Sequence, residues 1–145
     1  MSKINSRCYF LLLACLLFLI SEVQASEHYQ IVAHPKVHED VISVNVLRAI
    51  FSMRMRTWSN GNLIKVFVLP DNNQLHHDFS KEKLNLFPYQ LRSAWDRLVF
   101  SGTGQAPIFV DSHDEMLARV ASTPGAIGYL KTTYISDGIN VLHIK

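Results

Sequence analysis

The chain has 145 residues and a formal net charge of +2 at pH 7, and 48% of its residues are hydrophobic. This length suits one domain with its own core and leaves little room for two. Beyond residue 25 the chain holds 12 Lys and Arg (14 less Lys3 and Arg7) against 11 Asp and Glu (12 less Glu22). This near-neutral balance, with no basic stripe, argues against nucleic acid as a partner.

The first 25 residues have the pattern of a secretory signal peptide. Lys3 and Arg7 precede an apolar run, Cys8 to Ile20, that is too short for a stable membrane span. The small residues in Val23-Gln24-Ala25 predict cleavage after Ala25. We therefore expect a signal peptide over 1–25 and an exported domain over 26–145 that has no membrane span. An uncleaved membrane anchor is the alternative.

Both cysteines, Cys8 and Cys15, fall inside the predicted signal peptide. The exported domain would then contain no disulfide, no thiol nucleophile and no thiolate metal site. Export without disulfides is compatible with a bacterial periplasm, which is the predicted location.

The first half of the domain predicts a strand, a helix and a second strand. Tyr29 to Ala33 has the pattern of a short strand. A helix is expected from about Asp40 to just before Arg54, because its apolar residues recur at helical spacing: Val44, Leu47, Ile50 and Phe51. A turn follows at Trp58-Ser59-Asn60-Gly61. Leu63 to Leu69 is almost entirely apolar, as is typical of a central strand buried on both faces.

The second half predicts three helices and a last strand. Leu75 and Phe79 share one face of a helix that follows Pro70 to Asn73. A second helix begins at Pro88 and has an amphipathic stripe made of Leu91, Ala94, Trp95, Leu98 and Val99. Ser112 and Glu115 form a capping box for a third helix that ends near Ser122. A last strand is expected over Ile139 to Ile144. Strands that alternate with helices predict an α/β fold, with a mainly parallel sheet covered by helices.

Four stretches, in this order, resemble one large family. They are LRAIFSMRMRTWSNG (47–61), IKVFVLPDNNQLHHDF (64–79), WDRLVFSGTGQAP (95–107) and VASTPGAIGYL (120–130). Together they are similar to the phosphate-type, PstS-like periplasmic substrate-binding proteins of ABC transporters, and in particular to small single-lobe members. Full-length members have two lobes that close on a solute. The resemblance therefore implies a single lobe of the type 2 periplasmic-binding-protein fold, and a solute-binding protein rather than an enzyme.

The resemblance and the fold class place the predicted binding site in the loop after Leu69. Ligands of open α/β sheets bind beyond the carboxyl ends of strands, and a helix N-terminus favours anions. We expect a small oxyanion such as phosphate, or another polar solute, to contact the backbone amides of 72 to 75. The candidate ligand-binding residues are Asp71, Asn72, Asn73, Gln74 and His76, with His76 cationic only at mildly acidic pH. The alternative is that Asp71, Asn72 and Asn73 only cap the helix.

A second hypothesis follows from what this loop lacks. Phosphate-binding members carry an Arg and a Ser-Gly-Thr here, whereas this chain has neither, and Asp71 is itself an anion. A single lobe also has no cleft of its own, although a homodimer would supply the missing wall. The alternative is an interaction protein that docks on a sensor, transporter or other envelope assembly. Its candidate partner surface is an exposed edge with Arg54, Arg56 and Trp58.

No cofactor, metal site or catalytic constellation is expected. His76 and His77 are adjacent, so on a helix their side chains point about 100° apart and cannot share a metal. Ser101 and Thr103 lie in a Gly-containing loop but lack the Gly-x-Ser-x-Gly elbow of a serine nucleophile. No nucleophile is paired with a base, and the sequence therefore predicts a binding protein.

Overall fold

The computed structural model describes residues 29–145. The predicted signal peptide lies outside this range, and its cleavage stays a prediction. Within 29–145, none of the helices combines the length and the apolar character that crossing a membrane requires.

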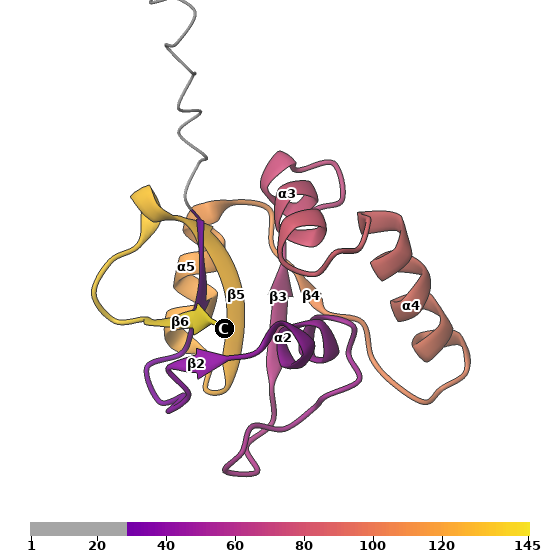
Figure 1. Cartoon of the computed structure of the whole chain (residues 1–145), viewed down its shortest axis with the longest axis horizontal. Helices are drawn as coiled ribbons and strands as arrows, with labels where there is room; N and C mark the ends of the chain where they lie inside the picture. Colours follow the sequence, from indigo (N-terminus) through magenta and orange to yellow (C-terminus); the bar gives the residue numbers. More distant parts are fainter. Residues whose placement is uncertain (1–28) are drawn as a thin grey trace, which may run out of the picture.

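A six-stranded mixed sheet forms the centre of the fold (Figure 1), with the order β2-β6-β1-β5-β3-β4. Its strands are β1 (Tyr29–Ala33), β2 (Val41–Ile42), β3 (Lys65–Val68), β4 (Ile108–Phe109), β5 (Ala126–Lys131) and β6 (Asn140–Ile144). The pairs β3–β4, β3–β5 and β2–β6 are parallel, whereas β1 runs antiparallel to both β5 and β6. The predicted mainly parallel α/β sheet is confirmed, with β1 as the strand that reverses direction.

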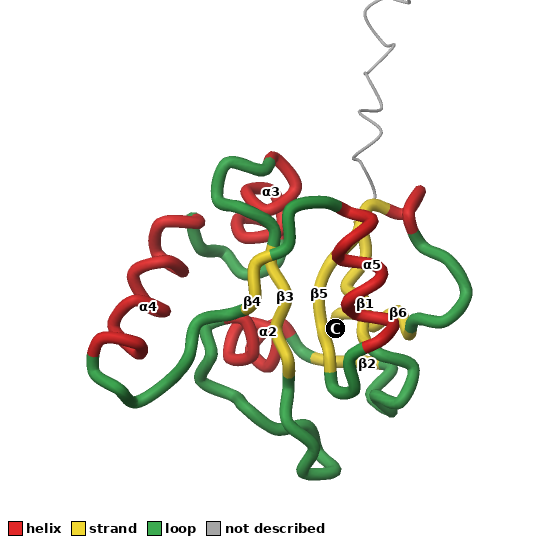
Figure 2. The backbone as a smooth tube through the Cα atoms, turned by 180° about the vertical axis from the view of Figure 1, so that it is seen from behind, coloured by secondary structure: helices red, strands yellow, loops and turns green. Residues whose placement is uncertain are grey.

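Helices cover both faces of this sheet. They are α2 (Val44–Phe51), α3 (Gln74–Glu82), α4 (Pro88–Phe100) and α5 (His113–Ser122), with a short 3-10 helix η1 (Thr132–Tyr134). Figure 2 shows α5 in front of the sheet, and α2 and α3 lie on the opposite side, in front in Figure 1. The helix α4 lies beyond the β4 edge. This arrangement brings α3 and α4 to the end of the sheet at which β3 finishes.

The strand β5 is buried along its length because it separates the two helical layers. Gly128 faces α5, where an added Cβ would lie 2.5 Å from the Met116 sulfur. Tyr129 points to the other side, and its ring stacks on Phe79 at 4.1 Å between centroids. Phe51 completes this aromatic cluster at 4.7 Å from Phe79. Removing such large apolar side chains from water is the main force that holds α2 and α3 on the sheet.

Two local predictions need correction, and two short strands were not predicted. The expected helix from about Asp40 begins only at Val44, because Val41–Ile42 pairs with β6 as an edge strand. Ser112 caps α5 as expected, but the Glu115 carboxylate accepts the amide hydrogen of Asp111 and not that of Ser112. The strand β4 was not predicted, because its two residues lie within a loop-like stretch of sequence.

Candidate functional site

The loop after β3 is a tight turn between a buried strand and a capped helix. Leu69 is fully buried, and the amide of Asn73 donates to the carbonyl of Pro70 at 2.9 Å. The Asn73 side-chain oxygen then accepts from the amides of Leu75 and His76, which makes Asn73 the N-cap of α3. The helix therefore begins immediately beyond the carboxyl end of a parallel strand.

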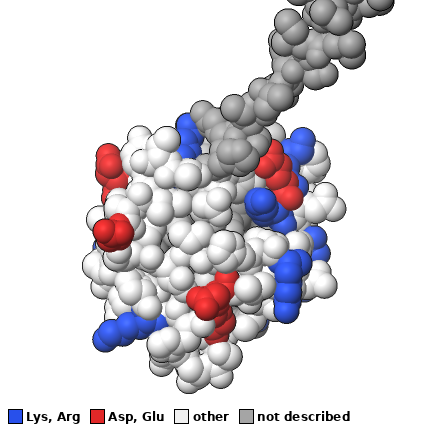
Figure 3. Space-filling view, turned by 60° about the vertical axis from the view of Figure 1, so that its left-hand side comes forward, with Lys and Arg blue, Asp and Glu red and all other residues white. Residues whose placement is uncertain are grey.

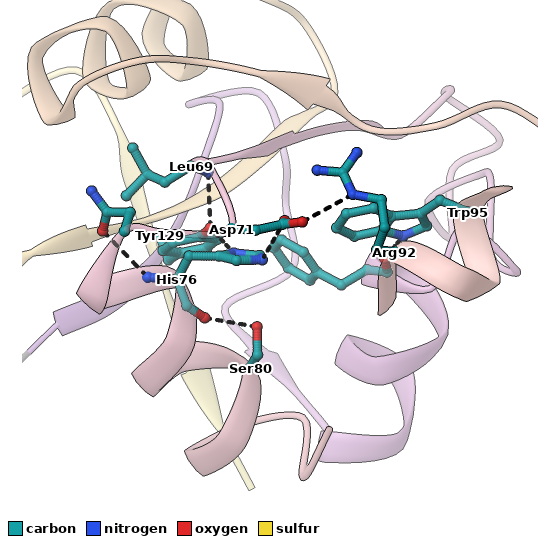
Figure 4. A network of polar contacts seen from close by, with 9 residues as sticks. Leu69, Asp71, His76, Ser80, Arg92, Trp95 and Tyr129 are labelled. Atoms are coloured by element: carbon teal, nitrogen blue, oxygen red, sulfur yellow. Dashed lines mark hydrogen bonds and ion pairs between the residues drawn. The ribbon is translucent and has the colours of Figure 1, made fainter. Parts of the chain in front are cut away.

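Tyr129 and His76 form a buried polar pair beneath this loop (Figure 4). The Tyr129 hydroxyl accepts from the Leu69 amide at 2.9 Å and lies 2.5 Å from Nδ1 of His76. The Tyr129 hydroxyl and Nδ1 therefore share one hydrogen bond, and which of the two atoms donates depends on the tautomer of the His76 ring.

The Nε2 atom of His76 points toward Asp71 but forms no hydrogen bond. It lies 3.8 Å from Asp71 Oδ1, which is beyond hydrogen-bond range. The ring has no exposed surface. Burial lowers the pKa of His76 to about 4, and although the Asp71 carboxylate opposes this shift, the Arg92 guanidinium reinforces it. The prediction that His76 is cationic at mildly acidic pH is therefore wrong, because the folded protein keeps the ring neutral there.

Arg92 from α4 supplies the cation of this loop. Its Nε donates to Asp71 Oδ2 at 3.0 Å. The guanidinium lies 4.5 Å from the Phe109 ring centroid and 5.6 Å from that of Trp95. Trp95 is itself fixed by the hydrogen bond that its indole donates to the Phe51 carbonyl. The two rings and Asp71 hold Arg92 at the loop while its terminal nitrogens make no hydrogen bond within residues 29–145.

Some of the predicted amide donors already make hydrogen bonds within the protein, and others do not. The amides of Asn73 and Leu75 are already used in the turn and the cap. Those of Asp71, Asn72 and Gln74 donate no hydrogen bond within the part of the chain that the structure describes. These three donors lie in the loop and at the start of α3, where unpaired amides and the helix dipole favour negative charge.

The predicted ligand-binding residues have different surroundings. Asp71 pairs with Arg92, Asn72 is exposed, and Asn73 is the helix cap. The Gln74 side chain is exposed but donates to Asp78 at 2.7 Å. His76 faces the core, so it supports the loop from below and does not offer its ring to solvent.

Only two of the three residues of the predicted partner surface are exposed. Arg54 and Arg56 are exposed, and Arg56 donates to the carbonyl of Thr103. Trp58 is only 4% exposed, and its indole donates to the Gly125 carbonyl at 3.0 Å. The expectation of an exposed Arg and Trp edge is therefore wrong for Trp58, which is a core residue that anchors the turn before β5.

Arg92 and Tyr129 are the two site residues that sequence reasoning missed. The sequence contains one signal for Arg92: it precedes Trp95 by three residues and so lies beside it on the same helical surface. Tyr129 appears only as part of an apolar strand, and nothing local indicates that its hydroxyl reaches the loop 60 residues earlier. Among residues 29–145, no group of three His, Cys, Asp or Glu side chains is placed to hold a metal ion.

The charge on one face of the molecule is mixed. Figure 3 shows one face on which Lys and Arg side chains lie among Asp and Glu in small separate groups. This face offers no broad surface of one sign. On this face, charge alone therefore marks no extended surface for an anion.

Comparison with known proteins identifies the class of fold. Neither a protein-family model nor a curated protein sequence matches the chain. Among solved structures, the fold matches an ABC-type phosphate transport receptor from Vibrio cholerae (TM-score 0.64, 11% identity, 80% of this chain and 45% of that one). It also matches a putative phosphate ABC transporter substrate-binding protein with bound phosphate from Clostridium perfringens (TM-score 0.63, 15% identity, 80% of this chain and 44% of that one). A third match is PstS from Borrelia burgdorferi (TM-score 0.62, 17% identity, 81% of this chain and 47% of that one).

These matches confirm the predicted resemblance at the level of the fold. The chain has the fold of a single lobe of a phosphate-type substrate-binding protein. It spans less than half the length of each of these three proteins, which is the share expected for one lobe of two.

Proposed function

We propose that this protein is a non-enzymatic solute-binding module that takes a small oxyanion at the loop after β3. The observation that carries this proposal is that the loop after β3 has three amides without an acceptor and that Asp71 of the same loop holds the Arg92 guanidinium. The amides of Asp71, Asn72 and Gln74 and the terminal nitrogens of Arg92 are donors without an acceptor among residues 29–145. Such a set of donors at a helix N-terminus suits an anion with several oxygens.

The comparisons support phosphate as the first solute to test. One of the matching proteins was solved with bound phosphate. This chain has no Arg, Ser or Thr within residues 70–77, so it would use backbone amides, the exposed Asn72 side chain and Arg92 from a different helix. Asp71 repels an anion, although its pairing with Arg92 reduces that repulsion. We therefore expect weaker binding than a loop rich in hydroxyl groups and arginine would give.

Isothermal titration with phosphate, sulfate and small carboxylates tests this proposal. Phosphate should bind one to one, and Arg92→Ala should weaken it about tenfold or more, since hydrogen bonds to charged groups contribute about 1.5–3 kcal/mol. Arg97→Ala removes the same charge from the same helix and should change nothing. An absence of heat with any of these anions at millimolar concentration would contradict the proposal, as would equal losses in the two variants.

A second candidate function is docking on an envelope protein. Three apolar side chains on α4 are strongly exposed: Tyr89 at 65%, Val99 at 49% and Phe100 at 89%. Val99 and Phe100 are adjacent at the end of α4, and exposed apolar side chains that are neighbours are typical of interaction surfaces. Capture of one specific partner from envelope extract, lost in a Val99→Ser/Phe100→Ser variant, would support this function. Equal capture by the variant would contradict it.

We also propose that the protein is exported to the periplasm after removal of residues 1–25. The basic start, the apolar run and the small residues before Ser26 support this proposal. Mass spectrometry of the protein from a bacterial periplasmic fraction should give a chain that begins at Ser26. A chain that retains Met1 and stays with the membrane would contradict it.

A further inference from the structure

A second concave site lies between α2 and α4, separate from the loop after β3. This α2–α4 groove has a volume of about 900 Å³, which is within the range of small-molecule sites. Its floor is apolar and consists of Leu86, Leu91, Ala94 and Leu98. It contains none of the loop residues 70–76 and does not contain Arg92.

Three arginines and no acidic residue line the groove. Arg48, Arg54 and Arg97 belong to α2, the turn after it, and α4. None of them is paired with a carboxylate within residues 29–145. Three positive charges that line one groove without an acidic partner repel one another, and an anion in the groove would relieve that repulsion.

Two of these arginines are held in place by hydrogen bonds to uncharged groups. Arg48 Nε donates to the Leu84 carbonyl at 2.8 Å, and its Nη1 donates to the Asn45 side chain at 3.3 Å. Arg54 Nε donates to the Ser52 hydroxyl at 3.0 Å. These contacts restrict the side chains while they leave guanidinium hydrogens available, which reduces the entropy that a ligand must overcome.

The opening of the groove adds an aromatic surface. Tyr89 is 65% exposed, and its ring stacks on Phe87 at 5.7 Å between centroids. An apolar floor, an exposed aromatic ring and fixed guanidinium groups together suit a ligand with an apolar body and an anionic head. An inorganic anion would leave the floor uncovered, and a neutral apolar molecule would leave the arginines unpaired.

We propose that the α2–α4 groove binds an amphipathic organic anion, such as a carboxylate or sulfonate carried on an aromatic or aliphatic body. The arginines pair with the head, and the floor of Leu91, Ala94 and Leu98 covers the body. This site is independent of the proposed oxyanion site, because the two share no residue.

The test is a fluorescence titration of the protein with 1-anilinonaphthalene-8-sulfonate, an aromatic anion that brightens in apolar surroundings. We expect saturable one-to-one binding that decanoate displaces and that millimolar inorganic phosphate does not. Arg54→Ala/Arg97→Ala should weaken it about tenfold or more. Lys36→Ala/Lys145→Ala, which removes two positive charges from outside the groove, should bind as the parent does.

Because Arg54 and Arg97 are both exposed, the double variant should keep the far-UV circular dichroism and melting temperature of the parent. Unsaturable binding, equal losses in the two double variants, or displacement by decanol as effective as that by decanoate would each overturn the proposal. Phosphate binding measured by calorimetry should be unchanged in Arg54→Ala/Arg97→Ala, so the failure of one site is distinguishable from the failure of the other.

Discussion

Arg92 donates to Asp71 at 3.0 Å across the gap between α4 and the loop after β3. The two residues of this pair lie 21 residues apart in the sequence. Their opposite charges determine the net charge of the candidate site. Arg92 provides the cation that the loop itself lacks, while Asp71 partly neutralises that cation. The site is therefore close to neutral when no solute is present.

Removal of the Asp71 charge should strengthen anion binding. Asp71→Asn keeps the size of the side chain and its acceptor for Arg92, but it removes a negative charge beside the three open amides. We expect phosphate to bind about tenfold tighter, which corresponds to about 1.4 kcal/mol. The measurement is calorimetric titration at low ionic strength, where exposed charges are least screened.

The matched control for this variant is Asp96→Asn, an exposed carboxylate on α4. It removes the same charge elsewhere and should leave the affinity unchanged. Weaker phosphate binding in Asp71→Asn would mean that Asp71 orders the loop more than it repels the solute. That result would contradict the electrostatic role assigned to Asp71.

His76 should make the protein less stable as the pH falls. Its pKa is about 4 in the folded protein, below the usual 6.5, because the ring is buried. Between these two values the unfolded chain binds the proton and the folded protein does not, so stability declines as pH drops through this window. From pH 7 to pH 5 we expect His76 to account for a loss of about 2 kcal/mol.

Urea unfolding of the parent and of His76→Asn at pH 7 and pH 5 measures this loss. The variant should be less stable than the parent at pH 7 but should lose about 2 kcal/mol less on acidification. His143→Asn, at an exposed histidine, should keep the pH response of the parent. If the parent and His76→Asn respond equally to pH, the ring is not buried in its neutral form.

The Tyr129 hydroxyl should contribute strongly to stability, because this one group is the hydrogen-bond partner of two buried groups. Tyr129→Phe would leave both the Leu69 amide and Nδ1 of His76 without a partner in the core. A buried group left unsatisfied costs about 1–3 kcal/mol, so we expect a loss of about 3 kcal/mol in unfolding free energy. Tyr134→Phe, at a partly exposed tyrosine, should cost less than about 0.5 kcal/mol. Equal effects would show that the Tyr129 network contributes little.

A comparison of Gly125 with Gly61 separates the cost of positive φ from the cost of a steric clash at the added Cβ. Both have positive φ, +78° at Gly125 and +83° at Gly61, but only Gly125 is tightly packed. An added Cβ would lie 2.1 Å from the Leu63 carbonyl oxygen at Gly125, whereas it would meet nothing within 4 Å at Gly61. We expect Gly61→Ala to cost about 1 kcal/mol and Gly125→Ala clearly more, measured by thermal unfolding. Equal losses in the two variants would mean that the close approach to Leu63 adds nothing to the cost of positive φ.

Much of the fold could be predicted because its main signals are local. Periodic apolar residues indicated α4, the Ser112 cap indicated α5, and the continuous apolar run before Pro70 indicated β3. The boundaries of α2 and the strands β2 and β4 were not predictable from local signals. Two-residue strands depend on their partners across the sheet, and no local periodicity marks them.

The sequence predicted which loop forms the candidate site, but not how its side chains are arranged. The sequence indicated the loop after Leu69, because a Pro-Asp-Asn-Asn run ended a buried strand. It did not show that His76 faces the core or that Arg92 reaches Asp71. Both facts depend on how α3 and α4 pack against each other and against β5. The prediction for Trp58 was wrong for the same reason, since its burial depends on a turn 67 residues later.

The most direct test of the proposed function is an amide NMR titration of the ¹⁵N-labelled protein with inorganic phosphate. We predict that the largest shifts occur at the amides of Asp71, Asn72 and Gln74, that they saturate, and that Arg92→Ala reduces them. The amides of Asn73 and Leu75, already hydrogen-bonded, should move less. Saturating shifts that are absent from the loop, or an unchanged spectrum at millimolar phosphate, would contradict the proposed oxyanion site.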